Sequence, residues 1–280
     1  MTRDTRTAWW FMAPALSAVA LVAVFPVVWT AWESLHLHDL RMPWRGRPFV
    51  GLANYAEIAR DSRFWSALGH TVFFTVTVVT VELVLGLAVA LLLNGAMRGR
   101  AILRVAALLP WGIPTVVVAL VWRFMFEADT AEWFVSPAAA WVPVIAADVW
   151  RMTPFVAILL LAGLQQIDAS LYEAAQMDGA GSWRQFREIT LPLVAPALVV
   201  AVLFRALDAF RVFDLVYVMT GGGPGTATEP LSLYAFNALL RNLRFGFGSA
   251  LTVIVFTAAL TVALVWIRLT GSAALPDNSR

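Results

Sequence analysis

Six long apolar runs dominate the sequence and restrict the chain to a membrane environment. A helix that crosses a bilayer needs about 20 apolar residues, and each run is that long. The runs are Ala8–Trp32, Leu68–Leu93, Val105–Phe126, Trp141–Leu164, Leu193–Met219 and Gly248–Ile267. Only 14% of the 280 residues are charged, whereas soluble domains have about 25%. The sequence therefore predicts an all-α polytopic membrane protein with six transmembrane helices.

The first run is too long for the apolar region of a signal peptide, because apolar residues continue past Ser17–Ala20. We therefore expect an uncleaved first span. Six spans place both termini on one side, and a small excess of Arg in the corresponding loops favours the cytoplasm. The predicted organisation is a cytoplasmic N-terminus at 1–7, a transmembrane domain at 8–270 and a cytoplasmic tail at 271–280.

The composition excludes several classes of function. The chain has no Cys and no Lys, which excludes a thiolate metal site, a thiol nucleophile and the lysine of a P-loop ATPase. The net charge of +2 gives no indication of nucleic-acid binding. His36, His38 and Asp39 lie close together, but in an exposed loop without a further cluster of ligands. We therefore predict no metal site and no catalytic residue.

The segment 165–192 has more local structure than an ordinary loop needs. Asp168 is a helix N-cap candidate, a short helix is expected over Leu171–Met177, and Gly179 lies in a predicted turn. A second helix is expected from Ser182, with Trp183, Phe186 and Ile189 on one face. Exposed charge at Glu173 and Asp178 beside the small Ala174 and Ala175 suits the docking of another protein. An ordinary connection between two spans is the alternative.

The same segment carries a motif with fixed spacing. Glu173-Ala174-Ala175 is followed by three residues, Gly179, nine residues and Ile189-x-Leu191-Pro192. This motif resembles the inner-membrane permeases of binding-protein-dependent ABC importers. Similarity to the carbohydrate branch (maltose, glycerol-phosphate and trehalose types) extends to Asp178-Gly179-Ala180, Trp183, Phe186, Gly51–Tyr55, Phe64–Thr71 and Thr220–Pro224. The run Leu203–Asp214 is similar to actinobacterial trehalose-import permeases.

The resemblance implies a permease subunit for a sugar, with a disaccharide such as trehalose or maltose favoured and glycerol phosphate as an alternative. It implies that Glu173, Ala174, Ala175, Asp178, Gly179, Ile189, Leu191 and Pro192 couple the chain to a cytosolic ATPase. The implied partners are a second permease subunit, two ATPase subunits and an extracytoplasmic solute-binding protein. The chain itself would bind no cofactor, and ATP with Mg²⁺ would bind to the ATPase. The resemblance implies a protein of a bacterial cell membrane whose motif faces the cytosol. With six spans, both termini then lie in the cytoplasm.

Ionisable residues inside spans are expensive and often functional. The fifth run has Arg205, Asp208, Arg211 and Asp214 at steps of three, so neighbours can pair along one helix. This ladder is either structural or contributes to a translocation pathway, in which aromatic residues such as Phe210 stack on a sugar. In the other runs, Trp150, Arg151 and Glu82 are further pathway candidates, and an ion pair between Arg151 and Asp148 is the structural alternative.

Two other functions compete. An ion-driven secondary transporter would also carry charges inside its spans, although such proteins often show inverted repeats that are not evident here. A polytopic membrane enzyme would use Asp208 and Asp214 as catalytic or metal-binding acids, but no cluster of acids and His accompanies them. The motif favours the ABC permease over both.

Overall fold

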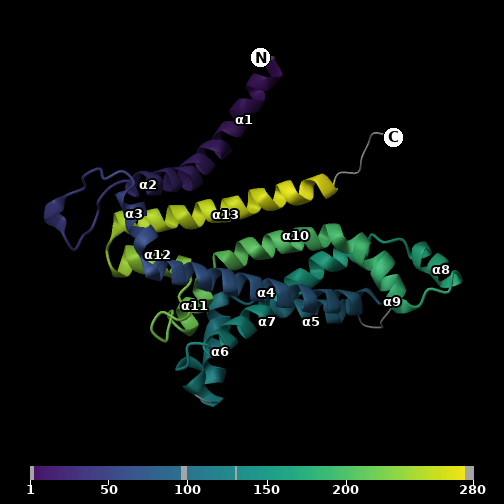
Figure 1. The fold of residues 1–280 in the computed structure, drawn as a ribbon. Helices are drawn as coiled ribbons and strands as arrows, with labels where there is room; N and C mark the ends of the chain where they lie inside the picture. Colours follow the sequence, from purple (N-terminus) through teal and green to yellow (C-terminus); the bar gives the residue numbers. More distant parts are fainter. Residues whose placement is uncertain (1–2, 96–99, 130, 275–280) are drawn as a thin grey trace. The chain divides into compact units, whose positions relative to one another are not determined.

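The computed structural model describes residues 3–95, 100–129 and 131–274. Within these residues, every regular secondary-structure element is a helix (Figure 1). The chain divides into two compact units. The first comprises Met1–Trp65 with Tyr234–Thr257, and the second comprises Ser66–Leu233 with Ala258–Arg280. The predicted all-α class is confirmed.

The first unit begins with a long apolar helical run. Helix α1 (Arg3–Val19) continues through a π-helical turn, η1 (Ala20–Val24), into α2 (Phe25–Glu33). Its apolar stretch Trp10–Glu33 is long enough to span a membrane, and the most apolar 18-residue window within it has no residue buried inside the chain. An apolar surface of this kind requires lipid or another protein around it.

Polar contacts tie together the remainder of the first unit. It contains η2 (Pro43–Arg45), α3 (Ala53–Arg60), η5 (Asn237–Arg241) and the start of α13 (Phe245–Ala274). Asn54 donates to the carbonyls of Ser34 and His36 at 2.8 and 3.0 Å. Tyr234, in α12 (Leu231–Phe236), donates to Asp61. Burial and this hydrogen bond raise the pKa of Tyr234. The connection after α2 is therefore ordered and contains the short helix α3.

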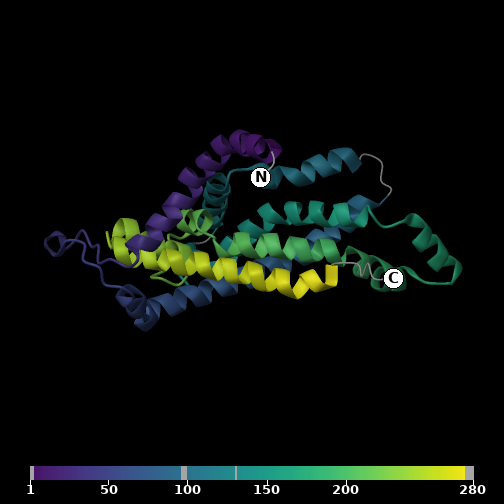
Figure 2. The ribbon, with the colours of Figure 1, turned by 90° about the horizontal axis from the view of Figure 1, so that it is seen from above.

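The second unit is built around α7 (Trp141–Leu164), which packs against α4 (Ser62–Asn94) and α10 (Leu191–Phe210) (Figures 1 and 2). Their shared core consists of Ala90, Leu93, Val156, Leu160, Leu161, Leu164, Val194 and Ala201. Glycine allows close contact: a Cβ added at Gly163 would lie 2.6 Å from the Ala197 Cβ. Small residues at such contacts are typical of packed membrane helices.

Five helical runs are long and apolar enough to cross a membrane, and a sixth span exists if one bent pair is counted. The runs are Trp10–Glu33, Ser62–Asn94, Trp141–Leu164, Ser182–Phe210 and Phe245–Thr270. Each overlaps a predicted span. The segment 165–192, called the predicted coupling segment below, and the predicted fifth span, Leu193–Met219, are partly one helix. The reason is that α9 (Ser182–Gln185) and η4 (Phe186–Thr190) lead without interruption into α10.

The expectation of a single helix over Val105–Phe126 was wrong. The structure has α5 (Arg100–Gly112) and α6 (Thr115–Asp129), and the two are bent by 92° at the break. Pro114 explains the break, because it has no backbone N–H and disfavours helical geometry at Ile113. A short turn, η3 (Ala131–Phe134), follows α6.

The expectation of one helix over Leu193–Met219 was also wrong. Helix α10 ends at Phe210, and α11 (Asp214–Met219) begins after three residues that leave helical geometry. Ser232 donates its hydroxyl to the Val212 carbonyl in this connection. That bond satisfies a backbone oxygen which the helix no longer uses.

Candidate functional site

The predicted coupling segment forms a short exposed helix that projects beyond the ends of α7 and α10 (Figures 1 and 2). Helix α8 (Ala169–Met177) has no buried residue. Asp168 caps it, because its Oδ1 accepts from the Ser170 backbone N–H at 2.9 Å. The same hydrogen bond holds the pKa of Asp168 below its usual value. The predicted helix start is confirmed.

Gly179 ends α8 in a left-handed turn with φ of 75°. The Ala180 N–H returns to the Ala175 carbonyl at 2.8 Å, and the Gln185 side chain donates to the Ala180 carbonyl at 2.8 Å. A residue other than glycine is strained at this φ. A Cβ at Gly179 would nevertheless meet no atom of the described residues within 4 Å. The glycine therefore serves the backbone here, and the space beside it is open.

The motif residues divide between the surface and the base of this helix. Glu173, Ala174, Asp178 and Gly179 are exposed, and Ala175 is half-buried. At the base, Ile189 is half-buried, whereas Leu191 and Pro192 are exposed. Tyr172 connects the two parts, since its hydroxyl lies 2.9 Å from the Thr190 Oγ1. Large apolar side chains are also exposed, with Met177 at 89% and Trp183 at 73%. Exposed Met and Trp side chains are enriched in protein–protein interfaces.

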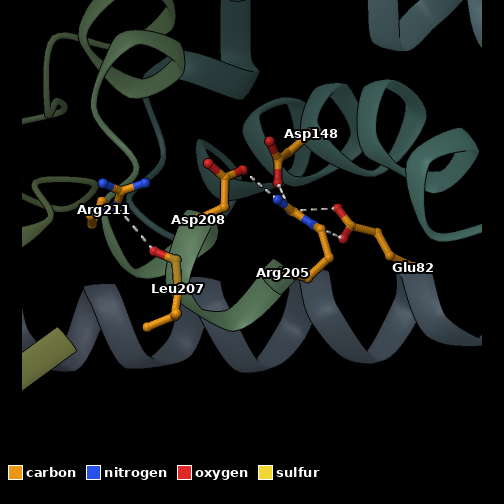
Figure 3. A network of polar contacts seen from close by, with 6 residues as sticks. All are labelled: Glu82, Asp148, Arg205, Leu207, Asp208 and Arg211. Carbon is orange, nitrogen blue, oxygen red and sulfur yellow. Dashed lines mark hydrogen bonds and ion pairs between the residues drawn. The ribbon is translucent and has the colours of Figure 1, made fainter. Parts of the chain in front are cut away.

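The second predicted group forms a buried ion cluster that joins three helices (Figure 3). Arg205 of α10 donates from Nε and Nη2 to the two oxygens of Glu82 on α4, at 2.5 and 2.9 Å. Its Nη2 also donates to Asp148 on α7 at 2.8 Å, and its Nη1 donates to Asp208 at 2.6 Å. The Arg205 and Glu82 side chains are only 1% and 0% exposed. One guanidinium thus holds α4, α7 and α10 together.

Asp208 differs from the rest of the cluster because half of its side chain is exposed. It borders a small cavity of about 130 Å³, which also reaches Asp148, Thr115, Arg151, Arg211 and Asp214. The start of α6, the end of α10 and the start of α11 meet at this cavity. Interrupted helices at membrane depth are tolerated where they line a cavity or are buried in protein.

Only the first step of the predicted charge ladder exists. Arg205 pairs with Asp208, but Arg211 lies beyond the end of the helix and donates to the Leu207 carbonyl at 3.3 Å. Asp214 begins α11 instead of continuing α10. The ion pair between Asp148 and Arg151, the structural alternative for Arg151, does not form among the described residues, where Asp148 pairs with Arg205. Arg151 has its Nε buried without a hydrogen bond in the described part of the chain.

The aromatic candidates are less closely associated with the cavity. Phe210 is buried in the second unit. Trp150 is partly exposed and lies 6.1 Å from the Trp122 ring, measured between centroids. Neither residue borders the small cavity at Asp208. Sequence reasoning missed Thr115, and the Gly112-x-Pro114 break just before it was the available signal.

The three residues weighed as metal ligands have other contacts. His36 Nδ1 lies 2.8 Å from the Trp32 carbonyl, His38 bonds Glu33, and Asp39 pairs with Arg41 at 2.6 Å. The prediction that this loop is exposed was wrong for His36 and Asp39, which are both buried. Within residues 3–95, 100–129 and 131–274, no group of three or more acids and His is arranged to hold a metal ion.

The comparison with known proteins concerns both sites. A family model described as binding-protein-dependent transport system inner membrane component matches residues 82–270. The chain belongs to this family. The matched range includes the whole predicted coupling segment and every member of the ion cluster, and the family resemblance predicted from the motif is confirmed. A member of this family is a multi-pass membrane component of a transport system and not an enzyme.

Relatives within the family match nearly the whole chain. The trehalose/maltose transport system permease protein MalF of Thermococcus litoralis is 40% identical, covering 95% of this chain and 94% of the relative. The trehalose transport system permease protein SugA of Mycobacterium tuberculosis H37Rv is 38% identical, with coverages of 97% and 91%. The sulfoquinovosyl glycerol transport system permease protein SmoG of Agrobacterium fabrum is 38% identical, with coverages of 92% and 88%.

A solved structure shares the fold. A chain in the crystal structure of a bacterial ABC transporter involved in the import of the acidic polysaccharide alginate superposes with a TM-score of 0.80. The alignment covers 98% of this chain and 99% of that chain at 20% sequence identity. The similarity supports the architecture of this family for the present chain.

Proposed function

We propose that this chain is the permease subunit of an ATP-driven ABC importer, and that it translocates a sugar delivered by a solute-binding protein. A disaccharide such as trehalose or maltose is the favoured solute, because two relatives at 38–40% identity are named for these sugars. The sulfoquinovosyl glycerol relative, also at 38% identity, makes a sugar conjugate the second candidate.

The observation that carries the proposal is the form of the coupling segment. Helix α8 is capped at Asp168, ended by the left-handed Gly179 and free of buried residues. A helix of nine residues is too short to be stable in water unless its ends are capped and it makes contacts with the rest of the protein. Here the cap, the turn and the contact between Tyr172 and Thr190 supply them. A preformed, exposed helix suits docking into a cleft of the ATPase.

Movement of α8 reaches the membrane through α10. Tyr172 contacts Thr190, and the helical run continues from Ser182 to Phe210. Arg205 then connects α10 to Glu82 and Asp148. In the proposed cycle, closure of the ATPases displaces α8, and α4, α7 and α10 move together as one body. Domain movements of this kind require packed elements that do not deform separately.

The proposal places α8 in the cytosol, where ATP is available. With six spans in a bacterial cell membrane, both termini are then cytoplasmic. The connection between α2 and α3 lies on the extracytoplasmic side. Two ATPase subunits and a second permease subunit complete the importer. ATP and Mg²⁺ belong to the ATPases, since this chain has neither a Lys nor a P-loop to hold phosphates.

The charged candidates take different roles in this proposal. Glu82 and Arg205 are sealed from solvent and position their neighbours. Asp208, with Arg151 at the same cavity, is placed to contact a solute hydroxyl in the pathway. Phe210 and Trp150 support the helices, because neither borders that cavity.

Reconstitution tests the proposed function. The chain is co-expressed with the other subunits, placed in liposomes and supplied with the solute-binding protein and labelled trehalose or maltose. Uptake is expected only with ATP in the compartment of the ATPases, and a protonophore should leave it unchanged. Uptake by the chain alone that collapses with the protonophore would instead identify an ion-driven secondary transporter.

A further inference from the structure

A second and larger cavity lies in the first unit, apart from the coupling segment and the ion cluster. Its volume is about 500 Å³. It is lined by Trp29, Thr30, Glu33, His38, Leu40, Arg47, Leu239, Phe245, Ser249 and Thr252. The volume falls within the range of about 300–1,000 Å³ that is typical of small-molecule sites.

The cavity lies at the ends of two candidate membrane spans. The first apolar span ends at Glu33, and the last one begins at Phe245. Both residues line the cavity. Trp29 lies one turn inside the first span, at the depth where amphipathic rings are usual. The cavity therefore lies at the level of lipid headgroups.

Glu33, which lines this cavity, has a buried and unsatisfied acceptor oxygen. Its side chain is only 5% exposed. The Oε1 atom bonds the His38 Nδ1, and the His38 ring stacks on Phe245 at 5.0 Å between centroids. The Oε2 atom is buried and has no hydrogen-bond partner among the residues that the structure describes. A buried carboxylate oxygen without a donor is costly, so a donor supplied by a ligand would stabilise it.

The other walls of the cavity supply complementary chemistry. Arg47 brings a fixed positive charge and a planar set of N–H donors suited to phosphate. Leu40, Leu239 and the rings of Trp29 and Phe245 give apolar surface. The site thus combines an acceptor for a cationic donor, a donor for an anion and an apolar wall.

We propose that this cavity binds the headgroup of an aminophospholipid. The primary ammonium group donates to Glu33 Oε2, the phosphate accepts from Arg47, and the glycerol and acyl chains run along the apolar wall. A phosphatidylcholine headgroup fits less well, because its quaternary ammonium has no N–H to donate. The inference concerns a lipid site and is independent of the transported solute.

Native mass spectrometry of the full-length chain, in the assembly in which it purifies, tests the proposal. Short-chain phosphatidylethanolamine and phosphatidylcholine with the same acyl chains are titrated separately. The ethanolamine lipid is expected to bind about tenfold more tightly, because a charge-assisted hydrogen bond distinguishes the two. Glu33→Gln should remove this preference, whereas Arg47→Gln should weaken both lipids. Arg45→Gln is the matched control, since Arg45 is in the same loop but does not line the cavity.

Three results would overturn the proposal. Equal binding of the two lipids to the wild-type chain would show a non-specific apolar contact. Unchanged binding in Arg47→Gln would exclude the phosphate contact, and this test remains available if Glu33→Gln does not fold. Binding of sn-glycero-3-phosphoethanolamine, which has no acyl chains, as tight as that of the lipid would indicate a soluble phosphoamine instead.

Discussion

Arg205 and Glu82 are 123 positions apart in the sequence and form a two-pronged ion pair, with Nε to Oε2 at 2.5 Å and Nη2 to Oε1 at 2.9 Å. Both side chains are sealed from solvent. Removing one partner of such a pair leaves the other charge buried and uncompensated.

We therefore expect Arg205→Met to lower the free energy of unfolding by about 3–5 kcal/mol. Glu82→Gln should have a smaller effect, because its amide oxygen still accepts from Arg205. Thermal or chemical unfolding in detergent measures both. The control Arg184→Ala breaks an exposed pair and should lose at most about 1 kcal/mol. If Arg205→Met is as stable as the wild type, Arg205 does not hold the three helices together.

The contact between α7 and α10 at Gly163 should not accept a larger residue. Gly163→Ala places a Cβ 2.6 Å from the Ala197 Cβ, which is too short to form without moving a helix. We expect a loss of about 1–3 kcal/mol, as for other overpacked cores. The double variant Gly163→Ala with Ala197→Gly should recover most of that loss. One methyl group is then moved from position 197 to position 163, and the volume between the helices stays the same. Unfolding in detergent measures both variants, and a double variant no more stable than the single one would contradict the packing.

Substitutions at Gly179 separate backbone strain from partner contact. Gly179→Ala strains a residue at φ 75° and should lower stability by about 1–2 kcal/mol. Gly179→Trp should add little strain beyond that, because no atom in the described part of the chain lies within 4 Å of the added Cβ. In the reconstituted importer, the Trp variant should nevertheless lose far more ATP-driven uptake than the Ala variant. Gly181→Ala, at an ordinary φ of −69°, is the control for strain. Equal uptake by the Ala and Trp variants would argue against an ATPase at this surface.

Asp39 should make the first unit sensitive to acid. Hydrogen bonds from the Arg41 side chain lower the pKa of this carboxyl in the folded chain. The resulting stabilisation is complete above the unfolded pKa of about 3.9 and is lost as the pH falls through the lower folded value. Asp39→Asn should therefore destabilise the chain at neutral pH, with a difference that shrinks at pH values below about 4. Unfolding midpoints of both proteins across this range provide the measurement. A difference that does not change with pH would rule out the Asp39 carboxylate as a source of acid sensitivity.

Local signals were sufficient to predict the structured parts of the coupling segment. The capping residue Asp168 and the turn at Gly179 act within a few neighbours, so the sequence around them determines the geometry. The Gly112-x-Pro114 signal for the break between α5 and α6 was equally local. It was missed because the apolar run continues on both sides of it and indicated a single span. The end of α10 at Phe210 carries no Gly or Pro. It coincides with the Ser232 bond to Val212, twenty residues away.

The ion cluster was only partly predictable. Glu82, Asp148 and Arg205 were each conspicuous as charges in apolar runs, and the pairing of Arg205 with Asp208 follows from helical spacing. The choice of Arg205 over Arg151 as the partner of Asp148 depends on how three helices pack. No periodicity in the sequence contains that information, because the partners lie 57 and 123 positions apart.

The separation of Glu82 from Arg205 also has a consequence for biosynthesis. Chains are made at about 5–20 residues per second, so Glu82 leaves the ribosome roughly 6–25 s before Arg205. During that interval α4 carries an acid into or near the membrane without its partner, and α7 adds Asp148 before Arg205 is made. The final packing of α4 and α7 around this cluster therefore requires α10. We expect late synthesis of one arginine to be a step in the assembly of helices made long before it.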